Sequence, residues 1–200
     1  MRRQKGKFRE TVESIALALL VALFVRTFFL QAFKIPSSSM EPTLLVGDHI
    51  LVNKFIYGIR IPWIGVRFLD FYRPKRGDVI VFIYPRNPKK DFIKRVIAVG
   101  GEKVYIKGTT VYVDDRPIKD PWGVWKREGE RPEFGPVVVP KDHLFVLGDN
   151  RDNSMDSRYW GFVPMRDVLG KAFVIYWSWN GRAKGLLEKV RWSRIGRLIR

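Results

Sequence analysis

The sequence predicts a mainly β protein: an antiparallel β-sheet domain with a small irregular cap region, preceded by one N-terminal transmembrane helix. Three observations lead to this prediction. An apolar run of eleven residues follows Ser14. Short segments rich in Val, Ile, Phe and Tyr then recur between Gly, Pro, Asp or Asn turns. No long helical period is found between residues 34 and 180. Two hundred residues, 46% of them hydrophobic, are enough for one domain with its own core.

The anchor is predicted over residues 14–33. Its continuation beyond Val25 contains Arg26 as the only charge, and an arginine so near one end can extend to the lipid headgroups. A bilayer span needs roughly 20 residues, which this segment supplies. A buried amphipathic helix is the alternative, but the apolar side chains surround the whole helix. A cleavable secretory signal is disfavoured because Leu30-Gln31-Ala32 lacks a small-x-small cleavage site.

Charge distribution predicts the orientation of the anchor and its partners. Residues 1–10 and 182–200 together carry ten units of the net charge of +17. The basic N-terminus, residues 1–13, is therefore expected in the cytoplasm, with everything after Phe33 outside. Basic ends fit nucleic acid or anionic membrane lipid. No nucleic-acid-binding signature accompanies them, so we expect lipid and no nucleic acid. Cysteine is absent, which excludes disulfides and thiolate catalysis.

Residues 34–180 are predicted as the β domain. The expected strands share β-branched and aromatic residues bounded by turn residues: 49–55, 79–84, 92–99, 103–107, 110–113, 137–139, 144–147 and 171–179. Residues 104–113 predict a hairpin around Gly108. Residues 114–136 are polar and rich in Pro and Gly, and predict an irregular excursion or cap. The basic tail, 181–200, is expected either to form a helix from Gly185 or to be loosely ordered.

Two aromatic stretches leave alternatives open. Residues 61–72 interleave large aromatic residues with turn residues, and residues 177–179 read Trp-Ser-Trp at the end of a predicted strand. Amphipathic aromatic side chains favour the bilayer interface. These segments therefore predict either edges that rest on a membrane or ordinary core packing.

A serine cluster follows the anchor directly. Ser37, Ser38 and Ser39 lie between Pro36 and the Met-Glu-Pro sequence that begins at Met40, which predicts a rigid non-helical turn. Such a composition also occurs in linkers. The apolar continuation toward residue 52 favours a turn held at the edge of the sheet.

Lys94 lies in the middle of a predicted strand, where a charged residue is unusual. Alternation puts Lys94 on one face of the strand and Arg95 on the other, but the pattern does not reveal which of them is buried. A buried lysine loses its proton more readily, whereas arginine stays protonated. Lys94 can therefore act as a base toward a serine, unless it is a surface lysine on an edge strand. The two histidines, His49 and His143, lie in no recognisable triad context.

Residues 148–158 form a polar loop after an apolar strand. By its composition the loop is either a hydrogen-bonded site or a calcium loop with Asp149, Asp152 and Asp156 as ligands. It lacks the later glutamate and the spacing of an EF-hand, which disfavours calcium.

Together these segments resemble the bacterial type I signal peptidases (leader peptidases), serine proteases that remove signal peptides from exported proteins. The resemblance extends from the anchor to about Trp179. Residues 36–44 resemble the nucleophile box, 76–82 the structural strand box, Lys94-Arg95 the general-base box, and 148–158 the last box, in the family's order. The visible departure is Ser38, where the family commonly has glycine.

The resemblance implies a Ser-Lys dyad, with Ser39 as nucleophile and Lys94 as general base. Ser154 would orient the lysine, and the Ser37 hydroxyl with the Ser39 backbone N–H would form the oxyanion hole. The loop would be supported by ion pairs of Arg95, Asp149, Asp156 and Arg158. Neither a metal nor a cofactor is expected.

The substrates implied are preproteins that carry signal peptides. They would bind as an extended strand at an open sheet edge, with small side chains at the first and third positions before the cut. The apolar pockets for these side chains are expected to be lined by Phe33, Ile35, Met40, Leu44, Phe92 and Ile93. The enzyme is expected at the bacterial cytoplasmic membrane, single-pass, with the catalytic domain outside. The alternatives are a Ser-Lys autoprotease of the repressor-cleaving type and a membrane-tethered binding module.

Overall fold

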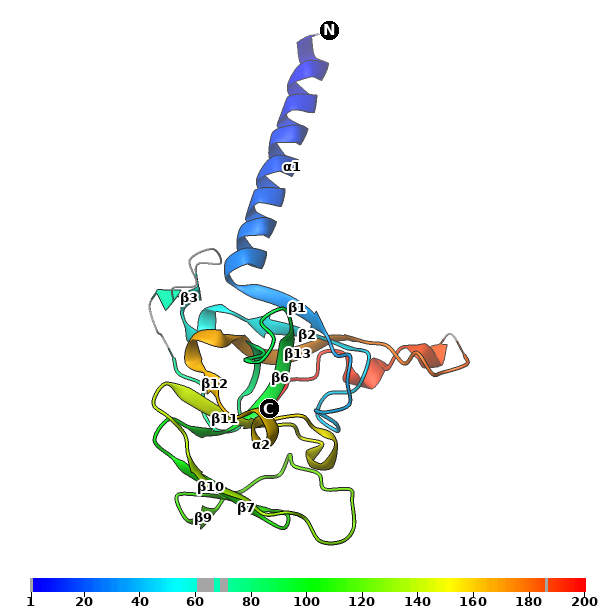
Figure 1. Ribbon diagram of the computed structural model, residues 1–200. Coiled ribbons are helices and arrows are strands. Elements are labelled where there is room, and N and C mark those ends of the chain that lie inside the picture. Colours follow the sequence, from blue (N-terminus) through cyan, green and yellow to red (C-terminus); the bar gives the residue numbers. More distant parts are fainter. Residues whose placement is uncertain (1, 61–66, 69–71, 186) are drawn as a thin grey trace.

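The computed structural model describes residues 2–60, 67–68, 72–185 and 187–200. Helix α1 (Arg2–Phe28) projects away from a body made of β-strands (Figure 1). The body is built on a seven-stranded sheet in which every recorded pairing is antiparallel. In spatial order its strands are β1 (Leu30–Lys34), β2 (Asp48–Asn53), β13 (Val168–Ser178), β5 (Val79–Ile83), β6 (Asp91–Val99), β11 (His143–Leu147) and β12 (Val163–Pro164).

A second sheet has four strands and lies at the opposite end of the body from α1 (Figure 1). Its order is β10 (Phe134–Val138), β7 (Lys103–Lys107), β8 (Thr110–Val113) and β9 (Arg116–Pro117). Two short strands, β3 (Ile59–Arg60) and β4 (Arg67–Phe68), pair with each other. The helices of the body are short: α2 (Ser157–Trp160) and the 3-10 turns η1 (Phe55–Tyr57), η2 (Arg151–Asn153), η3 (Met165–Asp167), η4 (Leu187–Lys189) and η5 (Trp192–Arg194). The prediction of a mainly antiparallel β fold is confirmed.

A hydrophobic cluster joins the large sheet to the residues that follow β1, and this packing positions the site. The cluster combines Ile35, which follows β1, with Met40 and Leu44 of the next turn and with side chains from β2, β5 and β13. Ile93 of β6 packs against the same cluster. Three strands separate β1 from β6 in the sheet order. Packing on this shared cluster therefore brings the turn after β1 close to β6.

The predicted anchor is wrong at its C-terminal end. Helix α1 ends at Phe28, and the four residues 30–33 belong to β1, which pairs with β2 from Leu30↔Asn53 to Lys34↔His49. The apolar composition continues smoothly into β1, so composition alone does not mark the boundary. Pairing with β2 determines it, because a strand there satisfies the backbone groups of both segments.

The apolar side chains of α1 between residues 12 and 25 are exposed, from 38% for Val25 to 65% for Leu20. Within the residues that the structure describes, no helix combines the length and the apolarity needed to cross a membrane.

The glycine hairpin is confirmed, with Lys107 opposite Thr110 and Gly108 at a φ of 59°. The excursion at 114–136 is shorter than expected, because Arg116–Pro117 form β9 and the segment from Phe134 belongs to β10. Of the aromatic stretch 61–72, residues 61–66 and 69–71 lie outside the described part of the chain. At the other stretch Ser178 is fully buried and Trp179 is 39% exposed.

Neither expectation for the C-terminal tail is correct. In place of a helix from Gly185 the described residues form the two 3-10 turns η4 and η5. The tail is not loose either, because Val190 bridges Trp179, Leu198 bridges Val174, and Ile199 joins the hydrophobic cluster under β1. Figure 1 shows the chain leaving the body after β13 and returning to it.

Candidate active site

The turn that carries the serines, residues 36–44, which we call the serine turn, is supported by the hydrophobic core. Ile35 N–H donates to Asp48 O at 2.8 Å, and Leu44 N–H donates to Met40 O at 2.9 Å. Met40 and Leu44 are both fully buried in the cluster under β1. Ser39, the residue before Met40, is therefore held by its neighbour at the sheet edge, and only 8% of it is exposed.

Lys94 projects from β6 toward this turn. Its Nζ lies 2.7 Å from Ser39 Oγ and also donates to Ile93 O at 3.0 Å. Lys94 is 4% exposed, so the surface-lysine alternative is wrong. Burial lowers the pKa of Lys94 to about 8, against an opposing effect of the Asp156 and Asp149 carboxylates, which raise it. A neutral amine is thus accessible near physiological pH, in contact with a hydroxyl.

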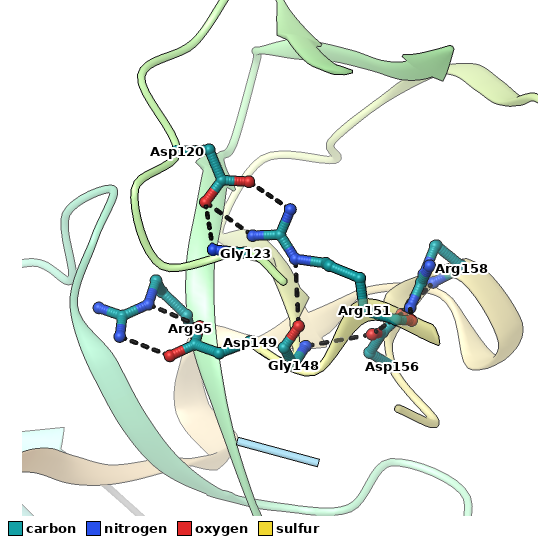
Figure 2. A network of polar contacts seen from close by, with 8 residues as sticks. All are labelled: Arg95, Asp120, Gly123, Gly148, Asp149, Arg151, Asp156 and Arg158. Atoms are coloured by element: carbon teal, nitrogen blue, oxygen red, sulfur yellow. Dashed lines mark hydrogen bonds and ion pairs between the residues drawn. The ribbon is translucent and has the colours of Figure 1, made fainter. Parts of the chain in front are cut away.

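Arg95 is buried on the opposite face of β6, as alternation requires. It pairs with Asp149 in a two-point contact, Nε to Oδ1 at 2.8 Å and Nη2 to Oδ2 at 2.7 Å, and both side chains are fully buried (Figure 2). Arg158 forms a similar pair with Asp156, with Nε to Oδ1 at 2.8 Å. Asp156 also accepts the Gly148 N–H at 3.1 Å. The four residues expected to support the loop therefore form two ion pairs.

Ser154 does not make the expected hydrogen bond to Lys94. Its Oγ is buried and has no hydrogen-bond partner, while Lys94 Nζ donates to Ser39 and to Ile93. The hydroxyl nevertheless lies at the site: a Cβ added to Gly148 would come within 2.2 Å of Ser154 Oγ and 2.4 Å of Ser39 O. Gly148 thus lets the loop approach both serines. Ser37 Oγ, the other expected hydroxyl, lies 3.5 Å from Ser39 Oγ.

A cavity of about 570 Å³ opens beside the dyad. It is lined by Pro36, Ser37, Ser38, Ser39, Asp91, Phe92, Ile93, Lys94, Asp152, Asn153, Ser154, Met155 and Tyr159. Phe92 and Ile93 line it as expected. The other four expected pocket residues do not: Ile35, Met40 and Leu44 are buried in the core, where they support the serine turn, and Phe33 packs against the same cluster.

The three acidic residues considered as calcium ligands point to separate partners. Asp149 pairs with Arg95 and Asp156 with Arg158, while Asp152 accepts the backbone N–H groups of Lys126 and Arg127 at 2.6 and 2.8 Å. Among the described residues no group of three or more His, Asp or Glu side chains is arranged to hold a metal ion.

Several contacts at the site involve residues that the sequence reasoning did not single out. The Asn150 backbone N–H donates to Ser39 O and its side chain donates to Ser38 O, both at 3.1 Å. Arg151 is fully buried, pairs with Asp120 of the excursion, and donates from Nε to Gly148 O at 3.1 Å (Figure 2). The density of polar residues at 148–158 could have suggested Asn150 and Arg151. Nothing local marks Asp120.

The irregular excursion, residues 114–136, contacts the loop that carries Ser154. Val124 N–H donates to Asp149 O at 2.7 Å, and Arg151 N–H donates to Val124 O at 3.0 Å. A Cβ on Gly123 would come within 2.4 Å of the Arg151 guanidinium, so a larger residue there would push this side chain away from Asp120 and Gly148. No residue from 114 to 136 lines the cavity beside the dyad. This segment therefore supports the loop and leaves the cavity uncovered.

Comparisons with known proteins identify the family of this chain. Residues 8–177 match the family described as signal peptidase, peptidase S26. Signal peptidase I of Pseudomonas aeruginosa is 39% identical to this chain in a match that covers 89% of this chain and 75% of that protein. Signal peptidase I of Aquifex aeolicus is 37% identical and covers 85% and 84%. A solved signal peptidase I from Enterococcus faecalis is similar over 50% of this chain and 97% of that one, with 34% identity and a TM-score of 0.44.

The family match extends across the serine turn, β6 and the polar loop, which are the segments that meet at the site. This chain belongs to the signal peptidase I family, peptidase S26, and is a serine endopeptidase of that family.

Proposed function

We propose that this protein cleaves signal peptides from exported preproteins, with Ser39 as nucleophile and Lys94 as general base. One observation carries the assignment of the dyad: a buried amine with a lowered pKa lies 2.7 Å from a buried hydroxyl. A serine hydroxyl is a weak nucleophile until a neighbouring base accepts its proton. Neither histidine lines the cavity, so Lys94 is the base that this geometry supplies.

In the first step neutral Lys94 accepts the Ser39 hydroxyl proton while Oγ attacks the scissile carbonyl carbon. The new Oγ–C bond moves an electron pair onto the carbonyl oxygen. The Ser39 backbone N–H and the Ser37 hydroxyl are the donors proposed for this oxyanion. Losing one such donor costs roughly 3–4 kcal/mol in other serine proteases. The tetrahedral intermediate then collapses, and the departing amine takes the proton from the Lys94 ammonium.

The second step releases the signal peptide. Lys94, neutral again, accepts a proton from a water molecule as that water attacks the acyl-Ser39 ester. Collapse of the second intermediate breaks the Oγ–C bond and returns the proton to Ser39. In both steps Lys94 alternates between base and acid, which a group with a pKa near 8 performs efficiently close to neutral pH.

Substrate selection is proposed to depend on the cavity beside the dyad. Phe92, Ile93 and Met155 give part of its wall an apolar character, while Ser37 and Asn153 provide polar groups. β1 is an edge strand of the large sheet, so its outer side offers unpaired backbone groups to an extended substrate. We propose that small side chains before the cut enter the apolar part of this cavity.

We further propose that residues 14–25 attach the protein to the bacterial cytoplasmic membrane, with residues 1–13 inside and the catalytic domain outside. Exposed apolar side chains along α1 support attachment to a lipid phase. Basic residues at the N-terminal end of the helix support this orientation. Extraction of cell membranes with alkaline carbonate tests attachment: the full chain should stay in the pellet, and its release into the supernatant would contradict the proposal.

Cleavage itself is tested with the purified full chain and a precursor that carries a signal peptide with small residues at the first and third positions before the cut. Processing should be lost in Ser39→Ala and in Lys94→Met. Ser38→Ala is the matched serine control and should reduce the rate mildly, because Ser38 Oγ contacts Asn153 and not the lysine. Undiminished processing by Ser39→Ala would refute the dyad. A wild-type chain that does not cleave the precursor would refute the proposed class of substrate.

A further inference from the structure

The last eleven residues, 190–200, return to the body and lie alongside β13; we call this segment the C-terminal strap. Ile175 N–H donates to Arg197 O at 3.0 Å, Gly196 N–H donates to Ile175 O at 2.8 Å, and Ile199 N–H donates to Phe173 O at 2.9 Å. The strap therefore continues the hydrogen bonding of the large sheet. It lies beyond residue 177, where the match to the family ends.

Arg194 connects the strap to the turn that follows Ser39. Its side chain is 9% exposed and pairs with the fully buried Asp48, with Nε to Oδ1 at 3.0 Å, while Nη2 donates to Thr43 O at 2.9 Å. Asp48 also accepts the Leu45 N–H at 2.8 Å and the Ser178 hydroxyl at 2.6 Å. One carboxylate thus joins the strap, the end of β13 and the turn 43–48.

The strap also contacts the segment that carries the lysine. Arg95, the neighbour of Lys94, donates from Nη1 to Arg200 O at 2.9 Å and from Nη2 to Thr43 Oγ1 at 3.3 Å. Ile199 packs in the same cluster as Met40 and Leu44, and Ile93 packs against that cluster. The strap consequently contacts the segments that carry both members of the dyad without contributing to the cavity.

We infer that the strap is a positioning element of the active site and that Arg194 is its central positioning residue, holding the Ser39 turn at hydrogen-bond distance from Lys94. The inference rests on the proposed dyad. A displacement of about 1 Å at reacting atoms can cost on the order of 100-fold in rate. Without Arg194, the buried Asp48 carboxylate loses its two-point partner and the Thr43 carbonyl loses a donor, so the turn relaxes.

This role differs from what the charge of the tail alone would imply. A basic tail that binds lipid presents its cations to solvent, and Arg197 of the strap has such an exposed side chain. Arg194 does not, because its guanidinium is directed into the body toward Asp48 and Thr43. Two arginines three residues apart in one segment thus provide a matched comparison between buried and exposed positions.

The test uses the full chain with Arg194→Met, and Arg197→Met as its matched control. We expect kcat of Arg194→Met to fall at least 30-fold while KM changes less than threefold. The pH midpoint of the rate should move upward by half a unit or more, because a relaxed turn admits water to Lys94. Arg197→Met should match the wild type in all three. Equal values in the two variants would overturn the inference.

Two additions keep the test decisive if Arg194→Met does not fold. Arg194→Lys keeps the charge but cannot reach Thr43 O and both carboxylate oxygens together, so its kcat should also fall, by about tenfold; wild-type kcat would overturn the inference. An NMR titration of the Lys94 amine needs no substrate. An upward shift of the Lys94 pKa in Arg194→Lys, absent in Arg197→Met, supports the positioning role of the strap even if the proposed precursor is not cleaved. An unchanged titration in a folded Arg194→Lys refutes it.

Discussion

The ionisation of Lys94 gives the sharpest test of the site. Burial lowers its pKa from 10.5 to about 8, a change of about 3 kcal/mol in favour of the neutral amine. At pH 7 about one molecule in ten then carries the free base, compared with about one in 3,000 for an unperturbed lysine. If only this form reacts, kcat/KM for a precursor peptide should rise about tenfold per pH unit below pH 8 and level off above it.

The assay measures kcat/KM between pH 6 and pH 10 at constant ionic strength. Ser38→Ala serves as the control, because its hydroxyl contacts Asn153, so its midpoint should stay near that of the wild type. A rate that still climbs at pH 10, with a midpoint near that of free lysine, would show that burial does not control the base. A rate independent of pH across this range would show that Lys94 is not the base at all.

Three further predictions follow from the same contacts. Between pH 8 and 10.5 Lys94 is protonated in the unfolded chain but neutral in the folded chain, so the free energy of unfolding should rise with pH across that window by up to about 3 kcal/mol. Urea titrations at several pH values should show this slope in the wild type and not in Lys94→Met. Identical slopes in the two proteins would contradict the burial effect. Gly148→Ala should reduce kcat at least 100-fold, because its Cβ would meet Ser39 O and Ser154 Oγ, whereas Gly181→Ala, with no atom within 4 Å, should leave kcat unchanged. Asp120→Ala leaves the buried Arg151 without its carboxylate and should lower the free energy of unfolding by about 3 kcal/mol, while Glu133→Ala, at an exposed ion pair, should not; a loss below 1 kcal/mol would refute the role of the excursion as a support.

The sequence was most informative where structure is local. Alternation along 92–99 placed Lys94 and Arg95 on opposite faces of one strand, and the structure agrees. The turn around Gly108 was predictable from the residues that flank it. Ser39, Lys94 and the polar loop 148–158 were identified from motifs and from their order along the chain. The distance between Ser39 and Lys94, however, could not be predicted from the sequence.

Prediction failed where residues distant in the sequence decide the structure. The anchor and β1 have similar composition, and the boundary depends on pairing with β2. Ile35, Met40 and Leu44 are apolar residues near a serine, so they were expected to line a pocket. They instead pack in the core with side chains from β2, β5 and β13, which are distant in the sequence. The pairs Asp120–Arg151 and Asp48–Arg194 join segments 31 and 146 residues apart, and no periodicity reveals such partners.

The pKa of Lys94 depends on a balance between burial and two neighbouring carboxylates. Asp149 and Asp156 both favour the charged amine and so oppose the effect of burial. Each carboxylate, however, is bound at two points by a guanidinium, Asp149 by Arg95 and Asp156 by Arg158. Each pair presents a dipole to the lysine in place of a full negative charge, so its field decreases faster with distance. Burial then outweighs the carboxylates. The loop can thus be rigidly held by ion pairs around an amine that must be neutral to react.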